Sequence, residues 1–142
     1  MKTVDKARKA VAAALTCAAV VGAGGRLTAH HSFSAEYDAS RPLMLKGTVA
    51  RVEWGNPHAW IYVAVADPAG TVVTWAIEAS APGALARRGL GRESVTPGMT
   101  VIVSGYRAKN GTPTARGLDL TLPDGRTLSL GSADPAAAVG AK

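Results

Sequence analysis

Three histidines are the side chains of this sequence best suited to bind a metal ion. His30 and His31 are adjacent, and His58 follows Pro57. If an export signal is removed after Ala29, His30 becomes the first residue, and its α-amine and imidazole Nδ1 together form a chelate. Nitrogen ligands without cysteine favour Cu(II) over Cu(I) or structural zinc. The pattern therefore predicts a copper(II) site formed by His30, His31 and His58.

A simpler interpretation of the same histidines needs no metal. His30 and His31 would then be a solvated chain end, and His58 would bond a backbone carbonyl at a strand edge. No metal-binding motif of fixed spacing, such as HExxH, occurs in the sequence, and spacing alone does not bring His58 near His30. Both interpretations stay open at this point.

Aromatic side chains form a second candidate site. Residues 58–66 alternate in a way that predicts a strand with one aliphatic face. Trp60 and Tyr62 lie on the opposite face, beside His58. Exposed Trp and Tyr rings are typical contacts of small ligands and partner proteins. The alternative is that the N-terminal arm, residues 33–37, folds back and covers these rings.

Basic residues at the end of a predicted short helix are a third candidate. The segment from Ser80 to Arg88 begins with a cap-like serine, and Gly89 follows as a natural stop. Arg87 and Arg88 would lie in its last turn, where cations stabilise the helix dipole. They predict either a small anion-binding patch or an ordinary solvated helix end.

Groups that could perform catalysis are sparse. No paired spacing relates the candidate carboxylates, which are Glu36, Asp38, Glu53 and Glu78. A glycine-rich phosphate loop is also missing from the sequence. The single cysteine, Cys17, lies in the N-terminal apolar run, so a mature chain would have neither a thiol nucleophile nor a disulfide. We therefore expect a non-enzymatic protein, and a hydrolase or other enzyme is the alternative ranked below the binding functions.

The first 29 residues are typical of a secretory signal peptide. A basic start precedes an apolar run, residues 10–21, which is shorter than the ~20 residues that a membrane-spanning helix needs. Ala29 suits the position before a cut, although Leu27 is bulky for the position two residues earlier. A cut after Ala23 competes, and an uncleaved anchor is a further alternative. We expect a periplasmic or secreted protein with no membrane span once the signal is removed.

Most of the positive charge belongs to this signal. The whole sequence has a net charge of +6, and its first 29 residues contain five basic residues and one acidic residue, which leaves +2 on the remainder. A nearly neutral surface argues against nucleic acid as a partner. We expect an unidentified periplasmic protein or a small ligand instead, and a monomer.

Strand patterns separated by turns account for most of the expected folded domain, residues 30–131. The predicted strands are Leu43–Trp54, His58–Ala66, Val72–Glu78, Thr100–Arg107 and a segment containing Leu118, Leu120 and Leu122, with a last short stretch at Thr127–Leu130. This order predicts a mainly β fold, a small five-stranded OB-like barrel with one short helix between strands 3 and 4. An immunoglobulin-like sandwich is the alternative. Residues 132–142 are rich in Ala and Gly, and we expect a disordered tail there.

Several short motifs follow one another along the chain. They include Ala29-His30-His31-Ser32-Phe33, Glu36-Tyr37-Asp38, Trp54-Gly55-Asn56-Pro57-His58 and Leu122-Pro123-Asp124-Gly125-Arg126. As an ordered set, these motifs resemble a bacterial family of small exported proteins known only as a domain of unknown function. The resemblance covers roughly residues 29–130 and implies an exported, β-barrel-like domain. It implies no activity.

The copper interpretation depends on the mature N-terminus and can be tested directly. The intact mass of the secreted protein should correspond to a chain that begins at His30, and this form should bind Cu(II). His30→Ala and His58→Ala should each weaken binding in a Cu(II) titration, because each removes a nitrogen ligand. A mass that begins at Gly24 would exclude the terminal chelate. Unchanged affinity in both variants would reject these ligands.

Overall fold

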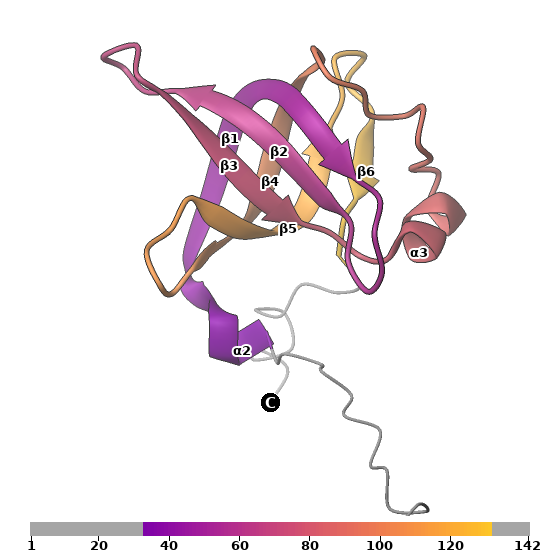
Figure 1. Ribbon diagram of the computed structural model, residues 1–142, viewed down its shortest axis with the longest axis horizontal. Coiled ribbons are helices and arrows are strands. Elements are labelled where there is room, and N and C mark those ends of the chain that lie inside the picture. The colour runs from indigo at the N-terminus through magenta and orange to yellow at the C-terminus, as the bar shows by residue number, and fades with distance from the viewer. Residues whose placement is uncertain (1–32, 132–142) are drawn as a thin grey trace, which may run out of the picture. The chain divides into compact units, whose positions relative to one another are not determined.

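A single six-stranded sheet organises the described part of the chain, residues 33–131 of a computed structural model (Figure 1). The elements are α2 (Phe33–Glu36), β1 (Tyr37–Glu53), β2 (Trp60–Ala66), β3 (Val72–Glu78), α3 (Pro82–Arg87), β4 (Thr100–Ala108), β5 (Thr114–Thr121) and β6 (Thr127–Ser129). The predicted signal peptide, the predicted tail and both N-terminal histidines, His30 and His31, lie outside the described residues. Neither helix within residues 33–131 has the length and hydrophobicity of a membrane span.

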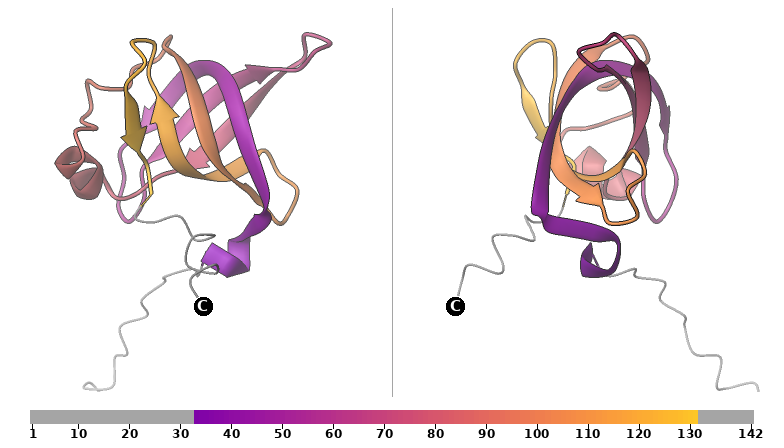
Figure 2. Two further views of the ribbon diagram at one scale, coloured as in Figure 1. Left: turned by 180° about the vertical axis from the view of Figure 1, so that it is seen from behind. Right: turned by 90° about the vertical axis from the view of Figure 1, so that its left-hand side faces the viewer.

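Five of the strands close into a ring. Neighbouring strands pair in the order β3-β2-β1-β4-β5-β6, and a short parallel pairing of β3 with β5 joins the two sides. The view along the ring in Figure 2 shows this closure. The ring is barrel-like, and α3 lies between β3 and β4 in the chain. The structure thus confirms the predicted mainly β, OB-like arrangement, in place of a two-sheet sandwich, and adds β6 as an extra strand beside β5.

The hydrophobic core fills this ring and follows from the alternation of the strands. Ile61 and Val63 of β2 are fully buried, as are Val101 and Val103 of β4. Because successive residues of a strand point to opposite faces, Trp60 and Tyr62 face outward, as the sequence predicts. Leu85 of α3 extends the same core beyond the strands.

The first strand is longer than predicted and pairs with both β4 and β2. It begins at Tyr37, six residues before the expected Leu43, and pairs with β4 as far as Thr48. Thr48 and the residues after it pair with β2, with an irregularity between Val49 and Arg51. The early start matters for the site, because it places Tyr37 within the sheet next to β4.

A glycine inside a strand often marks a bulge, but Gly47 has another role. The irregularity in the pairing of β1 with β2 begins two residues later, at Val49. Gly47 itself lies where β2 passes closely. A β-carbon at this position would overlap the carbonyl oxygen of Ala64 and lie 2.8 Å from Cγ1 of Val63. Glycine is therefore needed here for the close approach of two strands.

The helix α3 begins later than the sequence suggested. Ser80 was expected to cap it, yet the N-cap position is Ala81, and no side chain caps the helix. Ser80 still belongs to the extended chain, because its backbone N–H donates to the carbonyl of Leu130. Gly89, with φ of 86°, follows the last turn as predicted, and Pro82 lies in the first turn.

A bulge in β5 separates Leu118 from Leu120 and Leu122, which belong to the main core. The register shifts between Ser104 and Gly105 of β4, where Leu118 has no partner of its own. Leu120 joins the main core, whereas Leu118 packs on a second cluster formed by Tyr37, Tyr106 and Ala108 with Phe33. This second cluster holds α2 against the sheet.

The close approach at Gly47 leads to a stability prediction. Gly47→Ala should lower the free energy of unfolding by about 1–3 kcal/mol, because the added methyl group must displace the backbone of β2. Gly55→Ala is the matched control, since its β-carbon would meet only the carbonyl oxygen of His58 at 3.6 Å. The control should change stability by less than about 0.5 kcal/mol. Equal urea-unfolding midpoints for the two variants would contradict the close approach.

Candidate functional site

A buried carboxylate, Glu78, lies where the ring of strands closes. It is the last residue of β3, and it is 6% exposed. In the sheet it is paired with Trp60 of β2 on one side and with Arg116 of β5 on the other. The parallel contact of β3 with β5 covers only three residue pairs, so Glu78 is at the seam that completes the ring.

Three side chains from three different segments bind this carboxylate. The hydroxyl of Tyr37, from the start of β1, donates to Oε2. Nη1 of Arg116 donates to Oε1 at 2.6 Å, and Nδ1 of His58 lies 3.1 Å from the same oxygen. A buried charge needs such partners, because the protein interior solvates it poorly. Glu78 therefore joins β1, β3, β5 and the loop before β2.

Tyr37 is held firmly in this arrangement. Burial raises the pKa of its hydroxyl well above the usual range, and the hydrogen bond and charge of Glu78 and the charge of Glu36 raise it further, against a smaller opposing effect of Arg116. Tyr37 accordingly stays protonated and remains a donor. The ring of Phe33 stacks on its ring, with centroids 5.7 Å apart.

His58 is oriented by the same carboxylate. Its Nδ1 lies 3.2 Å from the carbonyl oxygen of Ala79 as well as 3.1 Å from Glu78. Both neighbours are acceptors, so Nδ1 carries the proton of a neutral ring, and the lone pair is on Nε2. The carbonyl contact is the one that the metal-free interpretation expected. The side chain is 37% exposed.

A metal site is not complete within residues 33–131. No group of three His, Cys, Asp or Glu side chains in that range could hold a metal ion. The other predicted copper ligands, His30 and His31, lie outside the described residues. Copper binding through His30, His31 and His58 therefore stays a prediction.

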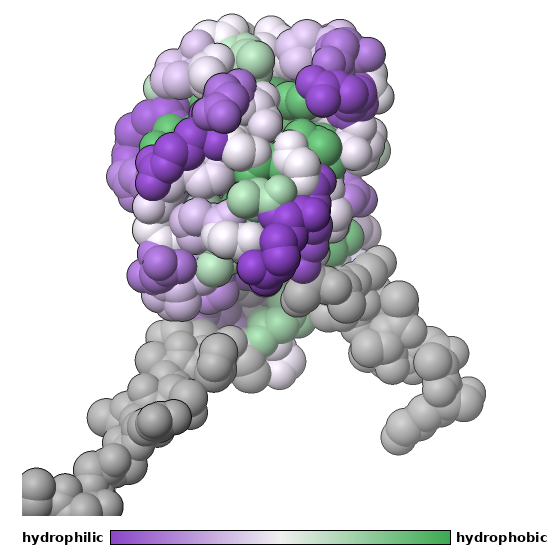
Figure 3. All heavy atoms as spheres, turned by 90° about the vertical axis from the view of Figure 1, so that its right-hand side faces the viewer, coloured by the Kyte–Doolittle hydropathy of each residue, from purple (hydrophilic) through white to green (hydrophobic). Residues whose placement is uncertain are grey.

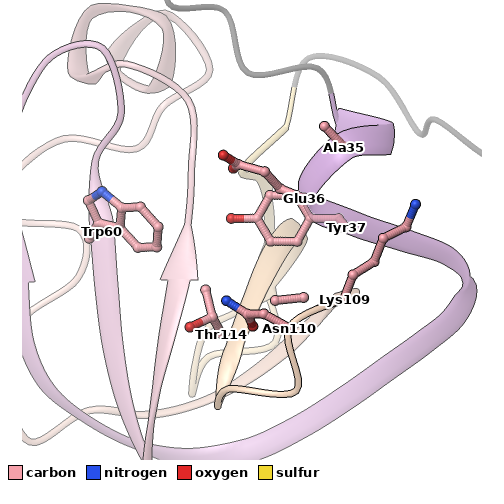
Figure 4. Close-up of a pocket in the computed structure, with 8 residues that line it drawn as sticks. Ala35, Glu36, Tyr37, Trp60, Lys109, Asn110 and Thr114 are labelled. Atoms are coloured by element: carbon pink, nitrogen blue, oxygen red, sulfur yellow. The ribbon is translucent and has the colours of Figure 1, made fainter.

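Next to the buried carboxylate is a hollow of about 520 Å³, which we call the Trp60 hollow (Figure 4). Its lining residues are Ala35, Glu36, Tyr37, Trp60, Ala108, Lys109, Asn110 and Thr114. Figure 4 shows Trp60 on one side and Tyr37 across from it, with the carboxylate of Glu36 directed toward the gap. Asn110 and Thr114 form the wall opposite Glu36.

The arm that carries Glu36 is fastened by Lys109. The backbone N–H of Lys109 donates to the carbonyl of Glu36 at 2.9 Å, and its Nζ donates to the carbonyl of Ser34 at 2.7 Å. The N-terminal arm therefore forms one wall of the hollow. This differs from the expected alternative, in which the arm covers the aromatic face, since Trp60 remains part of the lining.

Of the four residues predicted for a ligand face, Trp60 alone lines this hollow. The hydroxyl of Tyr62 donates to Glu53 at 3.1 Å, and the guanidinium of Arg51 lies 3.3 Å from the centre of its ring. Tyr62 is thus already engaged by two residues of β1.

The predicted basic patch is also partly engaged. Nη1 of Arg88 donates to the carbonyl of Gly131 at 2.6 Å and to Oγ of Ser80 at 3.3 Å, so this side chain joins the helix end to the last described residue. Arg87 is exposed. On the face around α3, hydrophilic residues interrupt the hydrophobic ones (Figure 3).

Sequence reasoning did not identify Glu78, Arg116 or Tyr37 as a group. The alternation of β3 does put Glu78 on the outward face, opposite the buried Ile77. The residues that cover Glu78 are distant in the sequence: Arg116 is 38 positions away and Tyr37 is 41 positions away. No local pattern reports such contacts.

The Tyr37–Glu78 hydrogen bond predicts an alkaline change in stability. Tyr37→Phe should lower the free energy of unfolding by about 2 kcal/mol at pH 7, because a buried charge loses a donor. The folded-state pKa of Tyr37 is raised above the ordinary value of 10.0, so the wild type loses stability above about pH 10 as only its unfolded form ionises. The variant has no hydroxyl at this position and lacks this loss. The difference in the free energy of unfolding between the two proteins should therefore shrink above about pH 10.

Urea unfolding of both proteins from pH 7 to about pH 11 measures this difference. Tyr62→Phe is the matched control, since its partner Glu53 is exposed, and its effect should stay below about 1 kcal/mol at every pH. A Tyr37→Phe effect that is constant across the range would show that the hydroxyl ionises normally in the folded protein.

Comparison with known proteins places the chain in a family. A family model, described as a family of unknown function (DUF6152), matches residues 16–118. This confirms the resemblance to a domain of unknown function that the ordered motifs indicated. No curated protein and no solved structure matches the chain. The model spans well over half of the 142 residues, including β1 to β4 and the first part of β5, and the chain therefore belongs to the family of unknown function DUF6152.

Proposed function

We propose that this chain is an exported, non-enzymatic binding protein of the periplasm or the cell exterior, and that its ligand occupies the Trp60 hollow. The observation that carries the proposal is the hollow itself, which has an aromatic wall, several polar groups and a volume of about 520 Å³. Ligand sites in proteins usually combine these features. The export part of the proposal rests on the N-terminal signal pattern.

The walls of the hollow are organised before any ligand arrives. Tyr37 is held by Phe33 on its ring and by Glu78 at its hydroxyl. Trp60 lies at the start of β2, between two strands, where it is paired with Glu53 and Glu78. Rigid walls reduce the loss of conformational entropy on binding, and this favours recognition by shape.

The role of Glu78 supports binding rather than acid–base catalysis. Its two carboxylate oxygens accept bonds from Tyr37 and Arg116, and His58 adds a third contact. A carboxylate with these partners orients its neighbours, and both of its oxygens are occupied by donors of the chain itself. Its function is to position the walls of the site.

Protein-observed NMR with a small library of carboxylates, alkylammonium ions, sugars and neutral aromatic compounds tests this proposal. At least one class should shift the Trp60 indole N–H together with the backbone amides of Asn110 and Thr114. Trp60→Leu should abolish those shifts, while Tyr62→Phe, outside the hollow, should retain them. Shifts that avoid all three probes, or that survive Trp60→Leu, would show that the hollow is not the site.

A second candidate function is Cu(II) binding, and the orientation of His58 favours it. Histidines that bind metals usually donate their second ring nitrogen to a carbonyl or carboxylate, which directs the remaining lone pair at the metal. His58 has this arrangement, with Nδ1 toward Ala79 and Glu78. The proposed partner ligands are His30 and His31, and the titration of the processed chain with Cu(II) decides whether they take part.

A further inference from the structure

We propose that the Trp60 hollow binds an organic cation, a substituted ammonium or guanidinium group carried by a small molecule or by a side chain of a partner peptide. This inference rests on the proposed function and adds the chemical class of the ligand. It is drawn from the arginines that lie over three other aromatic rings of the chain and from the charges that face the hollow.

Arginines of the chain lie over three other aromatic rings, both an outward ring such as that of Tyr62 and a core ring such as that of Trp75. The guanidinium carbon of Arg51 lies 3.3 Å from the ring centre of Tyr62, and that of Arg107 lies 4.8 Å from the ring centre of Trp75. Trp54 is similarly paired with Arg92, at 5.7 Å. Such contacts arise because the face of an aromatic ring attracts positive charge.

Trp60 differs from these rings. Within residues 33–131 it is the tryptophan that has no cation of the chain over its ring, and its side chain lines the hollow. Tryptophan is the strongest of the aromatic residues in attracting cations. A cation supplied from outside would take the place at Trp60 that arginines take at the neighbouring rings.

Negative charge inside the hollow favours the same ligand. Figure 4 shows the carboxylate of Glu36 directed toward the space between Trp60 and Tyr37. Its charge also contributes to the raised pKa of Tyr37, after burial and the effects of Glu78. Behind the wall, the charges of Arg116 and Glu78 balance each other through their 2.6 Å contact.

The one lysine of the lining is bound to the N-terminal arm and not to the centre of the hollow. Lys109 extends away from Trp60 in Figure 4, and its Nζ donates to the carbonyl of Ser34. It also borders a neighbouring hollow that contains Asp38 and Ser40. Hydrogen bonds from Ser40 and then the charge of Lys109 lower the pKa of Asp38, so the ammonium group acts on that side.

Two matched pairs of probes test the inference and separate its two sources. Choline and its neutral isostere 3,3-dimethylbutan-1-ol represent a free small molecule. N-acetylarginine amide and N-acetylcitrulline amide represent a peptide side chain. In calorimetric or NMR titrations, at least one cation should bind about tenfold more tightly than its neutral counterpart.

Variants then identify the groups responsible. Glu36→Gln should weaken binding of that cation about tenfold and leave its neutral isostere unchanged. Glu93→Gln removes the same charge outside the hollow and should have no effect. Trp60→Leu should abolish binding of the cation, and its circular dichroism spectrum should show that the sheet is retained.

The outcomes separate this inference from the proposed function. Equal binding of charged and neutral probes, binding that Glu36→Gln leaves unchanged, or no saturable binding of either cation would overturn the organic-cation ligand. The binding function would still stand if the NMR library finds another class at Trp60, Asn110 and Thr114. Cation binding that survives Trp60→Leu would reject the hollow as the site in both proposals.

Discussion

The burial of one carboxylate, that of Glu78, is the constraint on which the site depends. An uncompensated charge of this kind would strongly destabilise the folded state, and removing one partner from a buried pair typically costs about 3–5 kcal/mol. Arg116, Tyr37 and His58 supply the compensation from three separate segments. The closed ring, the position of the first strand and the orientation of the histidine therefore depend on one another.

Residues that stabilise the buried Glu78 also form the proposed binding sites. Tyr37 is both a partner of Glu78 and a wall of the Trp60 hollow, and His58 presents Nε2 because Nδ1 is engaged. A protein that shapes a pocket by a buried hydrogen-bond network gains rigid walls, since each member has few alternative positions. Outside the hollow, arginines of the chain itself lie over three aromatic rings and stabilise them by cation–π contacts.

The fold was predictable because its signals are local. Alternation in β2 and β3, turns between them and a short helix after the third strand specify the order of elements, and that order suits a small closed ring. The error at the start of α3 was also local in origin, because Ser80 resembles a helix cap but its backbone N–H donates to the carbonyl of Leu130. Glycine within a strand is typical of a bulge, yet Gly47 accommodates a neighbouring strand.

The sequence by itself determined the order of the strands along the chain, the outward position of Trp60 and His58, and membership of a family through ordered motifs. Only the tertiary structure decided that Glu78 is buried, because its covering partners lie 38 and 41 positions away and meet it at the parallel seam of the ring. Periodicity reports which side of a strand a residue faces. It does not report which distant segment covers that side, and that is set by the closure of the sheet.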